Sequence, residues 1–175
     1  MTYLALACRV LVGVTFLAAL VGKVRSRAAL RAFLTSLETL RWLPAWLRPV
    51  AATATLVAEL TIVGLVAWSP TAGAGLALAA VAVVVFTAAM VDARRRGARV
   101  ACRCFGGTAE VWGRAQLVRN VLLAGTAALG VLATMSSGAQ PPLAGVCVTA
   151  AGALVAALLL IHSQDVGYLL GLDRS

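Results

Sequence analysis

The chain has 175 residues, of which 62% are hydrophobic and 12% are charged, and its formal net charge is +9. So few charged side chains cannot cover the surface of a water-soluble domain of this length, which excludes a soluble globular protein. The positive charge does not indicate nucleic-acid binding, because it crowds into two loops and aromatic residues amount to only 6%. We therefore expect one integral membrane domain over residues 1–175, with the lipid bilayer as a partner and no nucleic acid.

Five apolar segments are long enough to cross a bilayer as helices, which takes about 20 residues. We predict spans at Tyr3–Gly22, Val50–Trp68, Gly73–Val91, Ala115–Met135 and Leu143–His162. The first is longer than the hydrophobic region of a secretory signal and follows no basic stretch, so we expect a span and not a cleavable signal peptide. The predicted fold class is all-α: an integral membrane helical bundle with a four-helix core, a fifth helix and an interfacial helix between the first two spans.

The segment Ala28–Leu43, between the first two spans, has a pattern of its own. Its leucines and its phenylalanine recur at helical spacing, with arginine and glutamate between them. This pattern predicts an amphipathic helix at the membrane interface that ends before Pro44, with Trp42 and Trp46 as interfacial anchors.

Positive charge is concentrated in the two loops Lys23–Arg48 and Asp92–Arg114, whereas Ser69–Ala72 and Ser136–Pro142 carry no charge. Short loops rich in lysine and arginine stay on the cytoplasmic side of a membrane. We therefore expect the cytoplasmic membrane, with the N-terminus outside and both basic loops and the C-terminus inside.

Two cysteines, Cys102 and Cys104, stand one residue apart in the second basic loop. Arg99 and Arg103 lie beside them, and cationic neighbours favour the thiolate, which attacks disulfides and binds soft metals. A C-x-C disulfide needs a tight turn, and Gly106 and the glycine after it supply turn capacity. The pair is our candidate for cycling between dithiol and disulfide. Inert cysteines and a structural disulfide stay open as alternatives, although a cytosol-facing loop is a reducing environment.

His162, the only histidine, is expected on the same side of the membrane as the cysteine pair. With Cys102 and Cys104 it would form a copper or zinc site, and the chain would then be a soft-metal binding or transport module. Alternatively, the imidazole would donate a proton beside a thiolate, or lie in the headgroup region without a chemical role.

Cys8 and Cys147 are a candidate second thiol pair. Each lies near the start of a predicted span, at a similar depth on the side opposite the basic loops. Neighbouring helices would let them form a disulfide or exchange electrons with the inner pair. Cysteines are also common in apolar helices simply as small buried side chains.

Glu59 lies near the centre of the second span, where a charge is costly unless it faces the bundle interior and is paired or protonated. Lys23 and Arg119 are its candidate partners, and Asn120 adds an amide to the same region. We predict a buried polar cluster near the cysteine loop. It serves either as a salt bridge between helices or in proton or electron transfer.

These motifs, in this order, resemble the MauE family of methylamine-utilisation membrane proteins, which is grouped with the DoxX-like redox-associated proteins. The resemblance rests on Gly22-Lys23, on Ala58-Glu59-Leu60, on the C-x-C-F-G loop with Cys102, Cys104, Phe105 and Gly106, and on Arg119-Asn120. It covers about residues 3–135, so the predicted span at about 143–162 lies outside it.

The resemblance implies a role in maturing or supplying redox partners, beside a thioredoxin-like protein outside the cytoplasm. Quinone-linked membrane disulfide enzymes are loosely similar, which makes quinone a candidate cofactor; those enzymes carry C-x-x-C, whereas this chain has C-x-C. An extracytoplasmic partner needs reactive groups outside, whereas the charge pattern puts the cysteine loop inside.

The sequence therefore favours a membrane thiol–disulfide oxidoreductase. The expected catalytic residues are Cys102, Cys104, Glu59 and Arg119, and the expected supporting residues are Lys23, Arg99, Arg103, Phe105, Gly106 and Asn120. A soft-metal module and a scaffold for a larger membrane complex are the alternatives.

Overall fold

The computed structural model describes residues 1–39, 44–96, 101–102, 110–111, 114–136 and 142–161. The helices are α1 (Thr2–Val24), α2 (Arg27–Ser36), α3 (Arg48–Ala67), α4 (Ala72–Arg95), α5 (Arg114–Met135) and α6 (Leu143–Ile161). Short 3₁₀ turns are η1 (Leu37–Thr39), η2 (Ala45–Leu47) and η3 (Ser69–Thr71), and two short strands are β1 (Ala101–Cys102) and β2 (Glu110–Val111). All helices except α2 are long and apolar enough to cross a membrane, and the all-α prediction is confirmed.

The interfacial helix is shorter than the predicted Ala28–Leu43. Ser26 caps its start, because the serine side chain accepts a hydrogen bond from the backbone N–H of Ala29. The helix ends at Ser36, where the N–H of Leu37 bonds to the carbonyl of Leu34 and tightens the last turn into the 3₁₀ turn η1. The predicted end was therefore wrong by several residues, and residues 40–43, Trp42 among them, lie outside the described residues.

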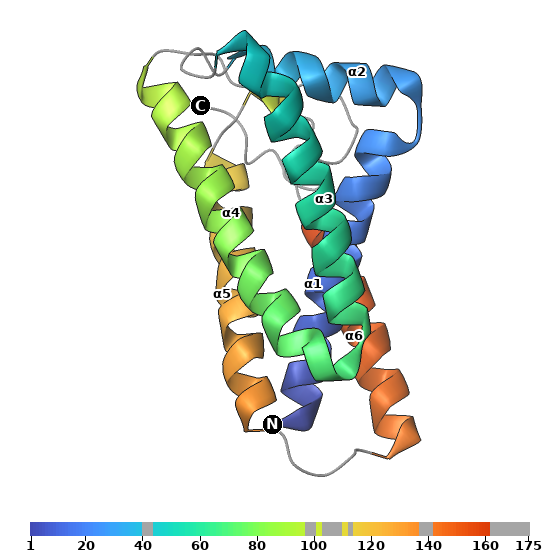
Figure 1. Ribbon diagram of the computed structural model, residues 1–175. Helices are drawn as coiled ribbons and strands as arrows, with labels where there is room; N and C mark the ends of the chain where they lie inside the picture. The colour runs from blue at the N-terminus through green and yellow to red at the C-terminus, as the bar shows by residue number, and fades with distance from the viewer. Residues whose placement is uncertain (40–43, 97–100, 103–109, 112–113, 137–141, 162–175) are drawn as a thin grey trace.

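Helices α1, α3, α4 and α5 form the core of the bundle (Figure 1). α1 packs against α3 and α5, and α4 packs against the same two helices from the other side, so the four close a ring. α6 packs mainly on α1, on the outside of the ring, and it is the least buried of the five long helices. The predicted core with an added fifth helix is thus confirmed.

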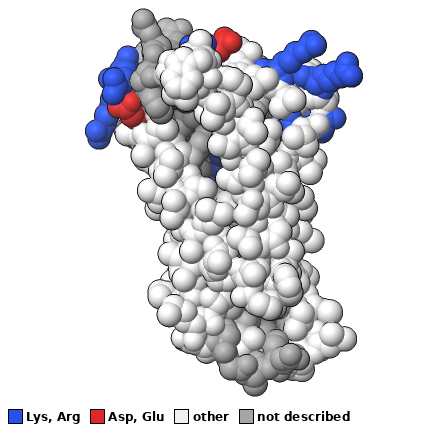
Figure 2. All heavy atoms as spheres, viewed as in Figure 1, with Lys and Arg blue, Asp and Glu red and all other residues white. Residues whose placement is uncertain are grey.

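The alternating directions of the helices bring all the basic segments to one end of the bundle, which we call the basic end (Figure 1). α1 and α4 finish there, α3 and α5 begin there, α2 lies across it, and α6 runs toward it from the opposite end. Figure 2 shows exposed arginine side chains gathered at this end. At the opposite end, Arg9 is the one charged side chain among the described residues.

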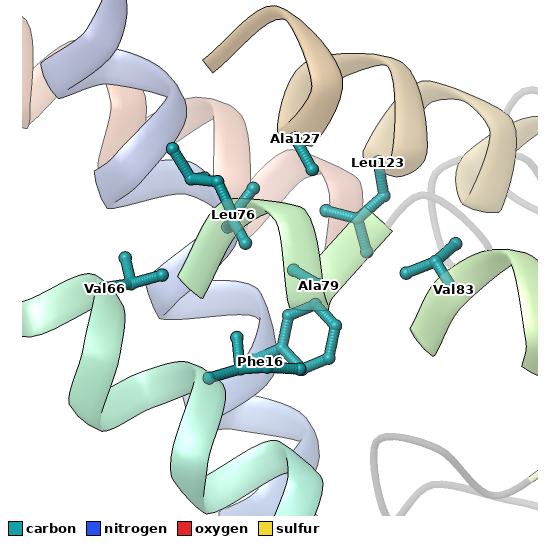
Figure 3. Packing of buried hydrophobic residues seen from close by; sticks show 9 residues of the cluster. Phe16, Val66, Leu76, Ala79, Val83, Leu123 and Ala127 are labelled. Atoms are coloured by element: carbon teal, nitrogen blue, oxygen red, sulfur yellow. The ribbon is translucent and has the colours of Figure 1, made fainter. Parts of the chain in front are cut away.

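Two apolar clusters fill the bundle. The larger cluster lies among α1, α3, α4 and α5, toward the end opposite the basic end (Figure 3). Its buried members are Val12, Phe16, Ile62, Val66, Leu76, Ala79, Val83, Leu123 and Ala127. The smaller cluster lies where α2 meets α3 and α4, and consists of Phe33, Leu37, Ala52, Met90 and Ala93. Phe33 and the partly buried Leu30 therefore pack the apolar face of α2 on the protein, whereas Leu34 is exposed.

Candidate functional site

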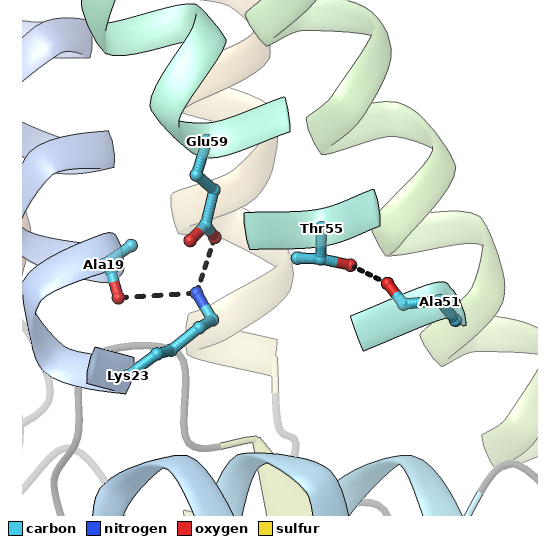
Figure 4. Close-up of polar contacts among 5 residues, drawn as sticks. All are labelled: Ala19, Lys23, Ala51, Thr55 and Glu59. Atoms are coloured by element: carbon cyan, nitrogen blue, oxygen red, sulfur yellow. Dashed lines mark hydrogen bonds and ion pairs between the residues drawn. The ribbon is translucent and has the colours of Figure 1, made fainter. Parts of the chain in front are cut away.

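A buried ion pair joins α1 to α3 in the half of the bundle nearest the basic end. The ammonium of Lys23 lies 2.5 Å from Oε1 of Glu59, and the two residues are only 3% and 8% exposed (Figure 4). Glu59 sits about 16 Å from the start of α3, at 1.5 Å per residue, which is about half the thickness of a bilayer core. Of the two partners predicted for Glu59, the structure pairs it with Lys23.

The surroundings of the ion pair are largely apolar. Lys23 also donates a hydrogen bond of 3.4 Å to the carbonyl of Ala19, one turn earlier in α1. The Phe33 ring of α2 lies 5.5 Å from the ammonium and makes a cation–π contact with it. Oε2 of Glu59 is buried and accepts no hydrogen bond from any residue that the structure describes. Among the described residues, one oxygen of this carboxylate therefore has a hydrogen-bond donor and the other has none.

The first turns of α5 add a second group of buried polar side chains. Gln116, Arg119 and Asn120 are all buried, and their spacing puts them on one face of the helix. The amide of Asn120 donates a hydrogen bond of 3.0 Å to the hydroxyl of Thr87 on α4. Each of the four core helices thus contributes a buried or partly buried polar side chain to a polar layer, made of Lys23, Glu59, Thr87, Gln116, Arg119 and Asn120.

Gln116 and Thr87 were not among the residues predicted from the sequence. Gln116 could have been found, because it precedes Asn120 by four residues and so shares its helix face. Thr87 carries no such signal, since many threonines of this chain bond to a carbonyl of their own helix, as Thr87 also does to Val83.

The cysteine motif lies between α4 and α5, at the basic end. Cys102 is in strand β1, which pairs antiparallel with β2, and the register puts Cys102 opposite Glu110 and Ala101 opposite Val111. The other motif residues, namely Arg99, Arg103, Cys104, Phe105 and Gly106, lie outside the described residues. The ladder pairs the chain at Cys102 with the segment that leads into α5, and we call this pair of strands the hairpin.

Comparison with protein families decides the family of this chain. Residues 1–133 match the family model described as methylamine utilisation protein MauE. The chain belongs to the MauE family. No curated protein and no solved structure matches it significantly.

The match to MauE covers the four core helices and α2, together with the polar layer and the cysteine motif, and ends within α5 at residue 133. α6 lies outside it. The matched region is therefore that of the four-helix ring.

Three predicted site residues of this MauE-family chain remain, namely Cys8, Cys147 and His162. Cys8 and Cys147 are both free thiols in the structure. Cys8 is buried on α1 against Gly130 of α5, whereas Cys147 is exposed on α6, and no disulfide joins them in the structure. His162 lies outside the described residues, and the described part of the chain contains no group of three histidine, cysteine or acidic side chains that could hold a metal.

Two further contacts of arginine side chains were not predicted. At the end opposite the basic end, Arg9 of α1 donates hydrogen bonds to the carbonyls of Val66 and Ala67 and to the hydroxyl of Ser69. Its guanidinium thus caps the last turn of α3. At the basic end, Asp92 accepts a hydrogen bond of 2.8 Å from Arg96, and this bond raises the pKa of the Arg96 guanidinium.

Proposed function

We propose that this membrane protein exchanges electrons with a thioredoxin-like partner, or supports maturation of a redox protein, through the dithiol of Cys102 and Cys104. The observation that carries the proposal is the C-x-C motif between α4 and α5, whose first cysteine is held in a hairpin at the basic end. Thiolates are the attacking species in disulfide exchange, and the arginines at positions 99 and 103 favour them. Membership of the MauE family agrees with a membrane role associated with redox proteins.

The exchange has two steps. In the first, a thiolate of the pair attacks one sulfur of the partner's disulfide, which forms a mixed disulfide and releases the partner's other sulfur as a thiolate. In the second, the other cysteine of the pair attacks the mixed disulfide as a thiolate. This forms the Cys102–Cys104 disulfide and releases the partner's second thiolate. Two electrons pass from this chain to the partner, and the reverse sequence oxidises the partner.

The polar layer favours this chemistry through the positive charge near the start of α5. α5 starts three residues after β2 ends and carries Arg119 and Asn120 in its first two turns. The cation of Arg119 and the N-terminal end of the α5 dipole both favour negative charge at this end of the bundle. In the proposed orientation, which follows the charge distribution, the basic end and the cysteine pair face the cytoplasm.

The test is the thiol redox state of membrane-embedded protein, measured by mass-shift alkylation with and without a disulfide-bonded thioredoxin-like partner. In the wild type, we expect the partner to oxidise two thiols to a disulfide, so that the number of alkylated cysteines falls by two. Cys102→Ser and Cys104→Ser should each abolish the transfer, and one of them should accumulate the mixed disulfide.

Cys147→Ser is the matched control, because Cys147 is an exposed free thiol remote from the hairpin in sequence and on α6. It should transfer electrons like the wild type. Unchanged partner oxidation in both Cys102→Ser and Cys104→Ser would refute the proposal. Thiols that become shielded only when copper or zinc is added would also contradict it and favour a metal site. A membrane-impermeant alkylating reagent, applied from each side in turn, identifies the face on which the pair reacts.

A further inference from the structure

In the Lys23–Glu59 salt bridge, only one of the two carboxylate oxygens accepts a hydrogen bond from a residue that the structure describes. In a buried carboxylate with a purely structural role, both oxygens are normally hydrogen-bonded, because the desolvation cost of an unpaired buried oxygen is not compensated. Here Oε1 of Glu59 accepts from Lys23, while Oε2 is buried and has no donor among the described residues (Figure 4). Oε2 is therefore an open position at which a proton can add.

The charged groups around Glu59 are few. Of the elements packed against α3, α1 supplies Lys23, whose ammonium is in contact with Glu59. α2, η1 and α4 carry their charges on exposed or partly exposed side chains, such as Arg31, Glu38 and Asp92. Arg119 is buried on α5, which packs against α1 and α4. Uptake of a proton by Glu59 thus acts mainly on its single ion pair with Lys23.

Access to Glu59 differs between the two ends of the bundle. Toward the basic end, the buried polar side chains Asn120, Arg119 and Gln116 follow one face of α5 up to its first turn, and α5 packs against α1, which carries Lys23. Toward the opposite end, the larger apolar cluster fills the ring, with members such as Val12, Ile62 and Leu76 fully buried. A proton moves along polar groups and the water they bind, and it does not cross a packed hydrocarbon core.

We propose that the Lys23–Glu59 pair is a proton-exchange site that opens only toward the basic end. A proton from that side adds to Oε2 and converts the carboxylate into a neutral carboxyl group. Lys23 keeps its own proton and its bond to Ala19, so the pair gains one positive charge and the ion pair between α1 and α3 is lost. Release of the proton restores it. The proposal does not depend on thiol exchange, because no cysteine takes part.

Dicyclohexylcarbodiimide tests the proposal, because it reacts with carboxyl groups in apolar surroundings only when they are protonated. The acid proton passes to a nitrogen of the reagent and the carboxyl oxygen bonds to its central carbon. We expect label on Glu59, located by peptide mass spectrometry, to rise as the pH falls. Glu59→Gln should lose the label, and Asp92→Asn should keep it, since Asp92 is partly exposed and bonded to Arg96.

Lys23→Gln sharpens the test. Loss of the neighbouring opposite charge favours the protonated carboxyl, so this variant should take up about tenfold more label than the wild type at a pH where the wild type is mostly ionised. Wild-type Glu59 that stays unlabelled at every pH at which the protein is folded would overturn the proposal and leave a permanent salt bridge. Label that does not vary with pH would overturn it as well.

Sidedness is tested in oriented vesicles with a different pH on each side. The label should follow the pH on the side of the basic end, and label that follows the other side would overturn the one-sided opening. The Cys102→Ser/Cys104→Ser double variant should be labelled like the wild type. Failure of thiol exchange and failure of proton exchange therefore give separate results.

Discussion

Replacing Gly75 of α4 by alanine tests how closely the two helices that hold Glu59 and Thr87 must pack. A Cβ atom at position 75 would lie 2.8 Å from the backbone nitrogen and a methyl carbon of Val66, and 2.9 Å from Cβ of Leu65. A backbone atom and a Cβ cannot rotate away, so α3 and α4 must separate. Restoring an ordinary contact of 3.4 Å from 2.8 Å requires a shift of about 0.6 Å. Overpacking of this kind costs about 1–3 kcal/mol, and lipid offers no hydrophobic gain to offset it.

Gly64→Ala is the matched control, because a Cβ atom there meets nothing within 4 Å. Both substitutions gain the higher helix propensity of alanine, about 1 kcal/mol. We therefore expect Gly64→Ala to be as stable as the wild type or more stable. The stability of Gly75→Ala should lie about 1–3 kcal/mol below that of Gly64→Ala. Reversible unfolding in mixed micelles of mild detergent and dodecyl sulfate, followed by circular dichroism, measures the difference. Equal stability of the two variants would refute the reasoning.

Three further predictions follow from the buried contacts. Lys23→Leu and Glu59→Leu should each cost about 3–5 kcal/mol in the same unfolding assay, and the double variant should be close to the wild type, because single removal leaves a buried charge unpaired. The loss in Lys23→Leu should shrink at acid pH, where Glu59 is neutral, and strictly additive losses would contradict a direct pair. Arg9→Gln should cost about 2–3 kcal/mol through the lost capping bonds of α3, with only partial recovery in Arg9→Lys, which lacks the planar fork. In detergent, N-ethylmaleimide should react at least about tenfold faster with Cys147 than with Cys8, and equal rates would contradict the burial of Cys8.

Most of the fold could be predicted from the sequence because each span is a long apolar run. The five predicted spans correspond to α1, α3, α4, α5 and α6, with ends that differ by a few residues. The end of α2 was missed because Leu37 and Leu40 continue its apolar spacing past Ser36, and only local backbone bonding stops the helix there. Helix order around the ring was also not predictable, since apolar residues face both lipid and core in every span.

The polar layer was partly predictable, because a charge in the middle of a span must face inward. That rule identified Glu59 and limited its partner to Lys23 or Arg119, and the geometry of α1 and α3 selected Lys23. It could not identify Thr87, because threonine is uncharged and is frequent in such helices. Nor could it find the role of Arg9, because the carbonyls it caps belong to the backbone of α3 and leave no trace in the side-chain pattern.

The two halves of the bundle are held together by different forces. Near the N-terminal end of α1, helices approach closely at glycines, as where Gly130 of α5 meets Cys8, and Arg9 bonds to the end of α3, so contact there depends on shape and on a cation that stays charged. Near the basic end, the ion pair and the bond from Asn120 to Thr87 join the helices, and the ion pair depends on the protonation of Glu59. A change of charge at Glu59 therefore acts on the half that carries the Cys102 hairpin and leaves the glycine contacts unaltered. The packed half can then stay fixed while the basic half responds.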